Sequence, residues 1–164
     1  MHFRTDETLV AKYRRHPTPY IFTVVKILIV SLPFYAIVFF IGRNLGDTFL
    51  VVALLIISLF VGFFLIYTFL IYFLDHLIVT NLRIIFVNWT SLFRREESEA
   101  ELVDIQEIKT FEHGVISFFK IFDYGNLRLE TASSKTTIVF DYAPNPEEIK
   151  HFILTYIRKR PKEV

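Results

Sequence analysis

A stretch of 26 residues without a charged side chain, Phe49 to Leu74, limits more than any other feature what this chain can fold into. Of these residues, 20 are Leu, Ile, Val or Phe. As a helix rising about 1.5 Å per residue, the stretch exceeds the roughly 30 Å hydrocarbon core of a bilayer. A buried core helix of this length does not fit a protein of 164 residues. The pattern therefore predicts a transmembrane helix.

A second apolar stretch comes just before the first. Residues 20–41 include 15 Leu, Ile, Val or Phe, and their one charge, Lys26, is near an end, where its stem can reach the headgroups. Only residues 42–48 separate the stretches. So short a loop predicts an antiparallel helical hairpin with spans at 20–41 and 49–74. A cleaved signal peptide fits poorly, because 19 residues precede the first stretch and no small-residue cleavage site is evident.

Positive charges near the spans predict the orientation of the hairpin. Several precede the first span and follow the second, whereas the connecting loop has one. Because such residues stay in the cytoplasm, we expect a two-pass protein of the cell membrane with both termini cytoplasmic, residues 1–19 forming an N-terminal cytoplasmic segment. The flanking residues are Arg4, Lys12, Arg14, Arg15, Arg83, Arg94 and Arg95, against Arg43 in the loop.

From Asp75 onward the chain has the charge content of a water-soluble domain, with 12 Lys or Arg and 14 Asp or Glu. Its net charge, 12 minus 14, is −2, which does not suit a nucleic-acid partner. The chain has no cysteine, which excludes disulfides, thiolate metal sites and a cysteine nucleophile. We expect a cytoplasmic domain over residues 75–160 and a tail at 161–164.

Residue alternation predicts that this domain is rich in β-strands. Residues 76–80 and 84–89 form a predicted hairpin that turns at residues 81–83. Residues 94–101 are interpreted as a solvated strand or loop, and Leu102, Ile105 and Ile108 mark a half-buried segment.

A second predicted hairpin pairs residues 127–131 with 136–142 across a turn at 133–135. Just before it, residues 123–126 spell Asp-Tyr-Gly-Asn. We interpret them as a turn in which Gly125 or Asn126 takes a positive φ.

The domain is predicted to end in a helix. Asn145 is placed to cap it, Pro146 suits the first helical position, and Glu147 and Glu148 lie at the positive end of the helix dipole. Arg158, Lys159 and Arg160 complement the other end. One apolar face follows from the spacing of Ile149, Phe152, Ile153, Tyr156 and Ile157.

The order of these elements resembles the membrane-flanked bacterial pleckstrin-homology-like family, which includes YdbS-like proteins. The resemblance covers about residues 14–157. It implies a seven-stranded, partly open β-barrel capped by the C-terminal helix, so that the fold class is membrane α + β. Its most specific residues are the Thr-Asn-x-Arg motif at Thr80, Asn81 and Arg83, and the Asp-Tyr-Gly turn at Asp123, Tyr124 and Gly125.

No pattern predicts catalysis, a cofactor or a metal ion. The five histidines form no i, i+3 or i, i+4 pair. Asp75 and His76 are neighbours, but adjacent strand residues point to opposite faces and no nucleophile is indicated nearby. The chain also lacks the glycine-rich patterns that cradle phosphates. We expect a non-enzymatic protein without a cofactor.

Two groups of charges are candidate binding surfaces. Acidic residues cluster after residue 95, and we interpret them as a solvated face or as a docking face for a basic partner. Arginines and a lysine form the other group, and each could contribute about 1 kcal/mol at an anionic membrane surface. The acids next to Arg95 oppose that interaction. The candidate docking face is Glu96, Glu97, Glu99 and Glu101, and the candidate lipid contacts are Arg94, Arg95, Arg158, Lys159 and Arg160.

These observations favour a membrane-anchored PH-like module that supports assembly or regulation of a membrane complex. Its expected partners are the lipid bilayer and a membrane protein or a second copy of the chain. An anionic-lipid headgroup sensor is the alternative. A small transporter or channel subunit is a third interpretation, which the scarcity of charge in the spans argues against.

Overall fold

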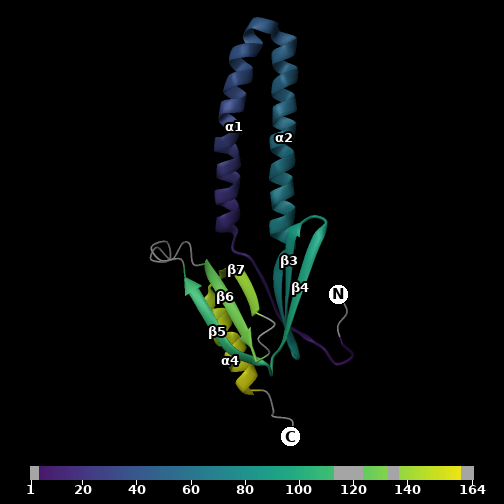
Figure 1. Cartoon of the computed structure of the whole chain (residues 1–164), viewed down its shortest axis with the longest axis vertical. Helices are drawn as coiled ribbons and strands as arrows, with labels where there is room; N and C mark the ends of the chain where they lie inside the picture. Colours follow the sequence, from purple (N-terminus) through teal and green to yellow (C-terminus); the bar gives the residue numbers. More distant parts are fainter. Residues whose placement is uncertain (1–3, 113–123, 133–136, 160–164) are drawn as a thin grey trace. The chain divides into compact units, whose positions relative to one another are not determined.

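In the computed structural model the chain divides into two units, residues 17–72 and residues 1–16 together with 73–164, and each is described by itself. The structure describes residues 4–112, 124–132 and 137–159. The elements follow in the order β1, α1, α2, β2 to β7 and α4 (Figure 1). In sequence, the two long helices are therefore inserted between the first and second strands of the other unit.

The helical unit consists of α1 (Pro17–Leu45) and α2 (Asp47–Leu74), which run antiparallel (Figure 1). Gly46 alone separates them, and its φ of 105° is one that residues with a Cβ rarely adopt. Helix α1 contains the first predicted span and extends beyond it at both ends, whereas α2 begins two residues before the second span and ends with it at Leu74. They confirm the predicted helical hairpin.

The two helices meet along a seam of half-buried or buried residues spaced three and four apart, the repeat that keeps one helix face toward a partner. Midway along the seam, the hydroxyls of Tyr35 and Ser58 lie 2.9 Å apart. A Cβ on Gly42 would come within 2.8 Å of Leu50, so this glycine permits the close approach near the loop. On α1 the seam is Val24, Ile27, Ser31, Tyr35, Val38 and Gly42; on α2 it is Leu50, Leu54, Ile57, Val61, Leu65 and Thr68.

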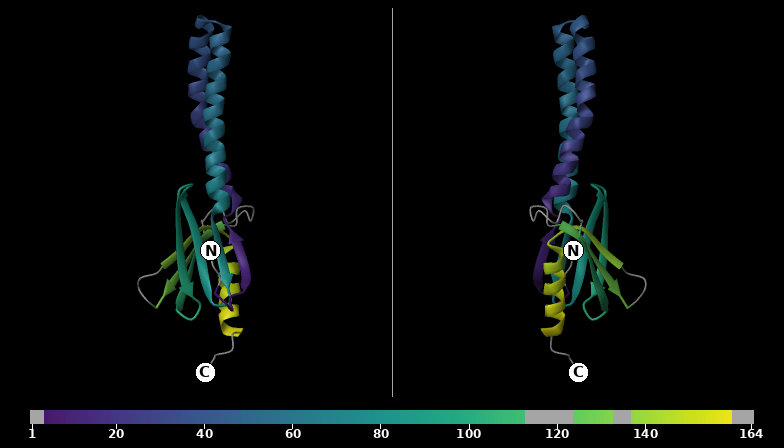
Figure 2. Two further views of the ribbon diagram at one scale, coloured as in Figure 1. Left: turned by 90° about the vertical axis from the view of Figure 1, so that its right-hand side faces the viewer. Right: turned by 90° about the vertical axis from the view of Figure 1, so that its left-hand side faces the viewer.

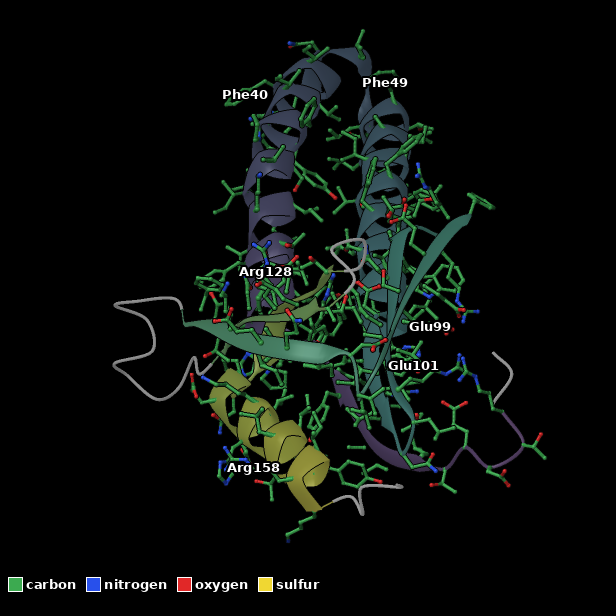
Figure 3. The ribbon with its side chains drawn as sticks, turned by 60° about the horizontal axis from the view of Figure 1, so that its bottom comes forward. Phe40, Phe49, Glu99, Glu101, Arg128 and Arg158 are labelled. Carbon is green, nitrogen blue, oxygen red and sulfur yellow. The ribbon has the colours of Figure 1, made fainter. Side chains whose placement is uncertain are left out.

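The outward faces of both helices are apolar and exposed. Leu59 is 74% exposed and Phe40 is 70% exposed, although a soluble protein would bury such side chains. Figure 3 shows Phe40 and Phe49 near the loop that joins the helices. Both helices are long and apolar enough to cross a membrane, and almost none of their most apolar windows is buried within the protein.

The first sheet of the other unit is antiparallel and has the order β1-β2-β3-β4. Its strands are β1 (Leu9–Arg14), β2 (His76–Thr80), β3 (Arg83–Ser91) and β4 (Arg94–Glu101). The hairpin of β2 and β3 confirms the first predicted hairpin, and residues 94–101 are a strand. One face of the sheet enters the main core, and Trp89 packs over a small apolar cluster on the other face.

The second sheet has the order β5-β6-β7, and α4 packs against β5 and β6. Its strands are β5 (Ile105–Glu112), β6 (Tyr124–Thr131) and β7 (Thr137–Pro144). The second predicted hairpin is confirmed in β6 and β7, whereas its predicted turn at 133–135 lies outside the described residues. The described strands form two sheets, of four and three strands, and the single partly open barrel is not confirmed.

The core of this unit lies between the two sheets and is closed by α4 (Pro146–Lys159). Phe86 and Phe140, one from each sheet, meet edge to face with ring centroids 5.4 Å apart. Ile149 and Ile153 of α4 are buried in the same core. Asn145 occupies the N-cap position, since its carbonyl accepts the first helical hydrogen bonds, from the amides of Glu148 and Ile149. Its side chain donates to the Glu148 carboxylate at 2.9 Å.

Part of the predicted N-terminal segment 1–19 forms a strand of this domain, β1 (Leu9–Arg14). Strand β1 pairs with β2, with Lys12 opposite Ile78 and Arg14 opposite His76. Ala11 and Tyr13 pack against the main core. The first sheet therefore contains the chain on both sides of the two helices.

The Thr-Asn-x-Arg motif holds the residues that precede β1. Arg83 binds the Glu7 carboxylate through Nε and Nη2, both at 2.9 Å. The Thr80 hydroxyl is 2.8 Å from the same carboxylate, and the Asn81 side chain accepts a hydrogen bond from the Thr8 amide at 2.7 Å. These contacts explain why this turn needs a hydroxyl, an amide and a guanidinium.

The turn predicted at residues 123–126 is wrong for the residues that the structure describes, because they are in a strand. Tyr124, Gly125 and Asn126 are the first residues of β6, and Asp123 lies outside the described residues. Among the described residues, positive φ angles occur at Gly46, Tyr142 and Asn145. A Cβ on Gly125 would lie 2.4 Å from the Phe111 carbonyl oxygen, so the glycine is needed for the close approach of β5.

Candidate functional site

Two charged residues flank the helices in sequence and meet in the folded domain. Arg15 comes two residues before α1, and Asp75 directly follows α2. Their Nη1 and Oδ2 atoms are 2.7 Å apart. The Asp75 side chain is fully buried and that of Arg15 is only 18% exposed. The ion pair therefore joins the chain entering α1 to the chain leaving α2.

The backbone and side chains of β3 complete this group. The other Asp75 oxygen, Oδ1, accepts a hydrogen bond from the Trp89 amide at 2.6 Å. Arg15 Nη2 donates to Asn88 Oδ1 at 3.3 Å. Burial raises the pKa of Asp75, while the Trp89 amide and the Arg15 charge act in the opposite direction. We call Arg15, Asp75, Asn88 and Trp89 the junction cluster.

Aromatic contacts add to the same end of the domain. The Arg14 guanidinium lies over the Phe73 ring, 4.3 Å from its centroid. The His16 ring stacks on Tyr124 at 5.6 Å, and the His16 amide donates to the Tyr142 carbonyl at 2.7 Å. Residues 14–16 thus contact both sheets.

Tyr142 is held in an uncommon backbone conformation to receive that contact. Its φ is 59°, a value that bulky residues rarely adopt. The Asn126 side chain accepts a hydrogen bond from the Tyr142 amide at 3.3 Å, which helps to hold this conformation. The strained residue lies where β7 meets the segment that enters α1, which marks the position as structurally important.

The groups around this end are arranged for structural roles. His76 Nδ1 lies 2.6 Å from the Leu74 carbonyl oxygen, and burial lowers the pKa of this histidine. No group of three or more His, Asp or Glu side chains within the described ranges could hold a metal ion. The junction cluster pairs charges with backbone and amide groups, so it can fix the two chain connections in place.

The turn between β3 and β4 lies at the same end of the sheet. His76, the first residue of β2, is opposite Val87, and β3 continues to Ser91. At about 3.4 Å per residue, the turn reaches roughly 13 Å beyond the row of His76, on the side of Leu74. Phe93 in this turn is 99% exposed. The ring is therefore available for contact with a surface outside the domain.

The four residues of the candidate docking face lie on β4, and each is already paired within the chain. Figure 3 labels two of them, Glu99 and Glu101. Each carboxylate has an arginine partner. Most of these pairs are exposed, so each contributes little to stability. They nevertheless reduce the negative potential that a basic partner would meet. The pairs are Arg94–Glu96, Arg95–Glu97, Arg83–Glu99 and Arg4–Glu101.

The structure does not bring the candidate lipid contacts together. Arg94 and Arg95 follow the β3–β4 turn, and Arg95 lies over the Trp89 ring of the junction cluster. Helix α4 starts where β7 ends and runs to the opposite end of the domain (Figures 1 and 2). Arg158 and Lys159 are exposed in its last turn, and Arg160 lies outside the described residues. One flat surface therefore cannot meet both groups.

Sequence reasoning did not identify the Arg15–Asp75 pair. It assigned Arg15 to membrane topology, and it considered Asp75 as a neighbour of His76 and as part of the family-like stretch that includes Thr80 and Arg83, without linking Arg15 to Asp75. A usable signal was present, however. In an antiparallel hairpin with a short loop, the residue before the first helix and the residue after the second lie at the same end, and here they have opposite charges.

Comparisons with known proteins agree with this architecture. A family model described as "Bacterial PH domain" matches residues 21–157. No curated protein matches the chain significantly.

Two crystal structures show weak similarity. One is a DUF1696 family protein with a pleckstrin-homology domain from Shewanella loihica, with 15% identity and a TM-score of 0.39 over 51% of this chain and 70% of that one. The other is a pleckstrin homology domain from Shewanella amazonensis, with 14% identity and a TM-score of 0.40 over 51% of this chain and 66% of that one.

Proposed function

The chain belongs to the bacterial PH domain family, and from this we propose that it is a membrane-anchored, non-catalytic PH-like module that supports assembly or regulation of a protein complex at the cytoplasmic membrane surface. PH domains are generally non-catalytic binding modules, which favours a binding role. In this proposal α1 and α2 cross the bilayer as a two-pass anchor. The domain then folds in water at the inner surface.

One observation carries the proposal: β1 precedes α1, β2 follows α2, and the two strands pair. The residues before α1 and the residues after α2 must therefore lie on the same side of the membrane. Two spans produce this arrangement. The excess of Lys and Arg beside the helix ends favours the cytoplasmic side. The chain passes directly from the domain into α1 and from α2 back into the domain, so a partner bound to the domain would be held at the membrane.

We place the partner contact on β4, an edge strand of the first sheet. Its outward face has one arginine followed by three glutamates, Arg95, Glu97, Glu99 and Glu101, and each glutamate is paired with an arginine of the same chain. A partner could exchange ion pairs with this face and gain specificity. Photo-crosslinking in cells from position Glu97, with position Val103 beyond β4 as the matched control, tests this placement. We expect a crosslinked membrane protein or second copy at Glu97 alone. A monomer without any crosslink or co-purifying protein contradicts the proposal.

Exposure of Phe93 favours a second candidate function, contact with anionic lipid through the β3–β4 turn. Arg94 beside it is exposed, and an aromatic ring next to arginine suits a bilayer interface. Because the chain has no cysteine, Phe93→Cys and Val103→Cys each give one labelling site. We expect an environment-sensitive dye to report a lipid environment only at position 93. Equal signals at both positions contradict the contact.

A further inference from the structure

A groove of about 680 Å³ runs between α1 and α2, within the size range of ligand sites. Its lining changes character along its length. Thr23, Lys26 and Thr68 line the end where α1 begins and α2 ends. Phe34 and Ile57 line the other end, and eight residues of helix, about 12 Å, separate Lys26 from Phe34.

Lys26 provides the one charge in this groove. Its side chain is exposed, and in the part of the chain that the structure describes no carboxylate pairs with it. The neighbouring hydroxyls donate to their own helices, Thr23 to the Pro19 carbonyl and Thr68 to the Phe64 carbonyl, each at 3.0 Å. Lys26 is therefore the donor that remains for an anionic ligand.

We propose that the groove binds one anionic phospholipid, with its phosphate at Lys26 and an acyl chain along the apolar end. The lining changes from polar to apolar along the groove, as a phospholipid changes from a charged headgroup to hydrocarbon tails. Lys26 lies near the end of the span, so its flexible stem can place the ammonium at the level of the lipid phosphates while the apolar end of the groove lies deeper. The inference rests on the proposed position of the helices in a bilayer.

A second copy of the chain does not supply the missing charge. Between Tyr20 and Leu74 the only acidic residue is Asp47, at the start of α2 and so at the opposite end of the hairpin from Lys26. In a parallel pair of hairpins, residues 20–74 of one copy would therefore place no carboxylate beside the lysine of the other. A phosphate from the surrounding lipid meets the requirement directly.

Lipid retention by the full-length protein tests the inference. The protein is reconstituted in vesicles of equal phosphatidylglycerol and phosphatidylcholine, re-extracted in mild detergent, and its bound lipid is measured by mass spectrometry. We expect about one phosphatidylglycerol per chain, favoured roughly fivefold over phosphatidylcholine, the ratio for about 1 kcal/mol per lysine. Lys26→Gln should remove this preference. Val30→Trp should reduce retention of both lipids, because the indole fills the apolar end.

Arg43→Gln is the matched control, since Arg43 lies in the last turn of α1, outside the groove. It should retain lipid as the native protein does. Equal retention of both lipids by the native protein overturns the inference, as does unchanged selectivity in Lys26→Gln. A lipid-free dimer assigns the groove to a partner helix and also overturns it. Failure to enter vesicles would instead contradict the proposed membrane anchor.

Discussion

Asp75 is a carboxylate buried in the domain, so its charge must be compensated by neighbouring groups. Its carboxylate is fully buried and depends on Arg15 and the Trp89 amide for compensation. Taking a charge out of water costs several kcal/mol unless a partner and hydrogen bonds replace the lost hydration. The pair is therefore costly to break, although an apolar pair could replace it.

Replacing Asp75 by alanine should lower the free energy of unfolding by about 3–5 kcal/mol, because it leaves the Arg15 charge in a mostly buried site. Chemical denaturation in detergent, followed by the fluorescence of the single tryptophan, measures this change. Asp104→Ala, at an exposed aspartate, should change it little. The double variant Arg15→Met/Asp75→Leu should recover much of the loss. Equal stability of Asp75→Ala and Asp104→Ala contradicts this account.

Glu7 predicts a specific pH dependence. Hydrogen bonds from the Arg83 side chain, the Arg4 amide and Thr80 hold the pKa of Glu7 at about 2, below its ordinary value of 4.5, despite burial. Ionised Glu7 therefore stabilises the fold above pH 4.5, and this contribution is lost as the pH falls toward 2. The stability difference between the native protein and Glu7→Gln should be largest above pH 4.5 and vanish near pH 2. A difference that does not vary with pH rules out this role.

At the scale of elements, pattern alone predicted both helices, the hairpins and α4, because their periodicity extends over enough residues to be distinctive. Strand β1 has only six residues, in which Ala11 and Tyr13 alternate with Lys12 and Arg14. The sequence analysis explained those same basic residues by the orientation of the helices in a membrane, and therefore did not predict the strand. Its pairing with β2 spans both long helices, of 29 and 28 residues, and such long-range pairing is not encoded locally.

Deleting residues 2–14 should unfold the domain while leaving both helices in the membrane. The deletion removes β1, the contact of Tyr13 with Phe152 and the Glu7–Arg83 ion pair. Limited trypsin digestion on membranes should cut within residues 75–159 at least about tenfold faster, the ratio for roughly 1.4 kcal/mol of lost stability. Deleting residues 161–164 is the control. Native resistance after removal of β1 would show that the strand is dispensable.

At the scale of the whole molecule, a pair of long apolar helices is inserted between the first two strands of a bacterial PH domain. Within the domain, the junction cluster joins the chain that precedes α1 to the chain that follows α2. This arrangement accounts for the exposed apolar helix faces, the location of the positive charges and the pairing of β1 with β2. Sequence could predict the parts because each has its own pattern, whereas the insertion itself depends on one strand pairing.

Extraction of membranes with alkaline carbonate tests the central claim most directly, because it removes peripheral proteins and leaves proteins with transmembrane helices in the bilayer. The account predicts that the full-length protein stays in the membrane pellet and requires detergent to dissolve. Release into the carbonate supernatant, with the protein soluble in the absence of detergent, would contradict it.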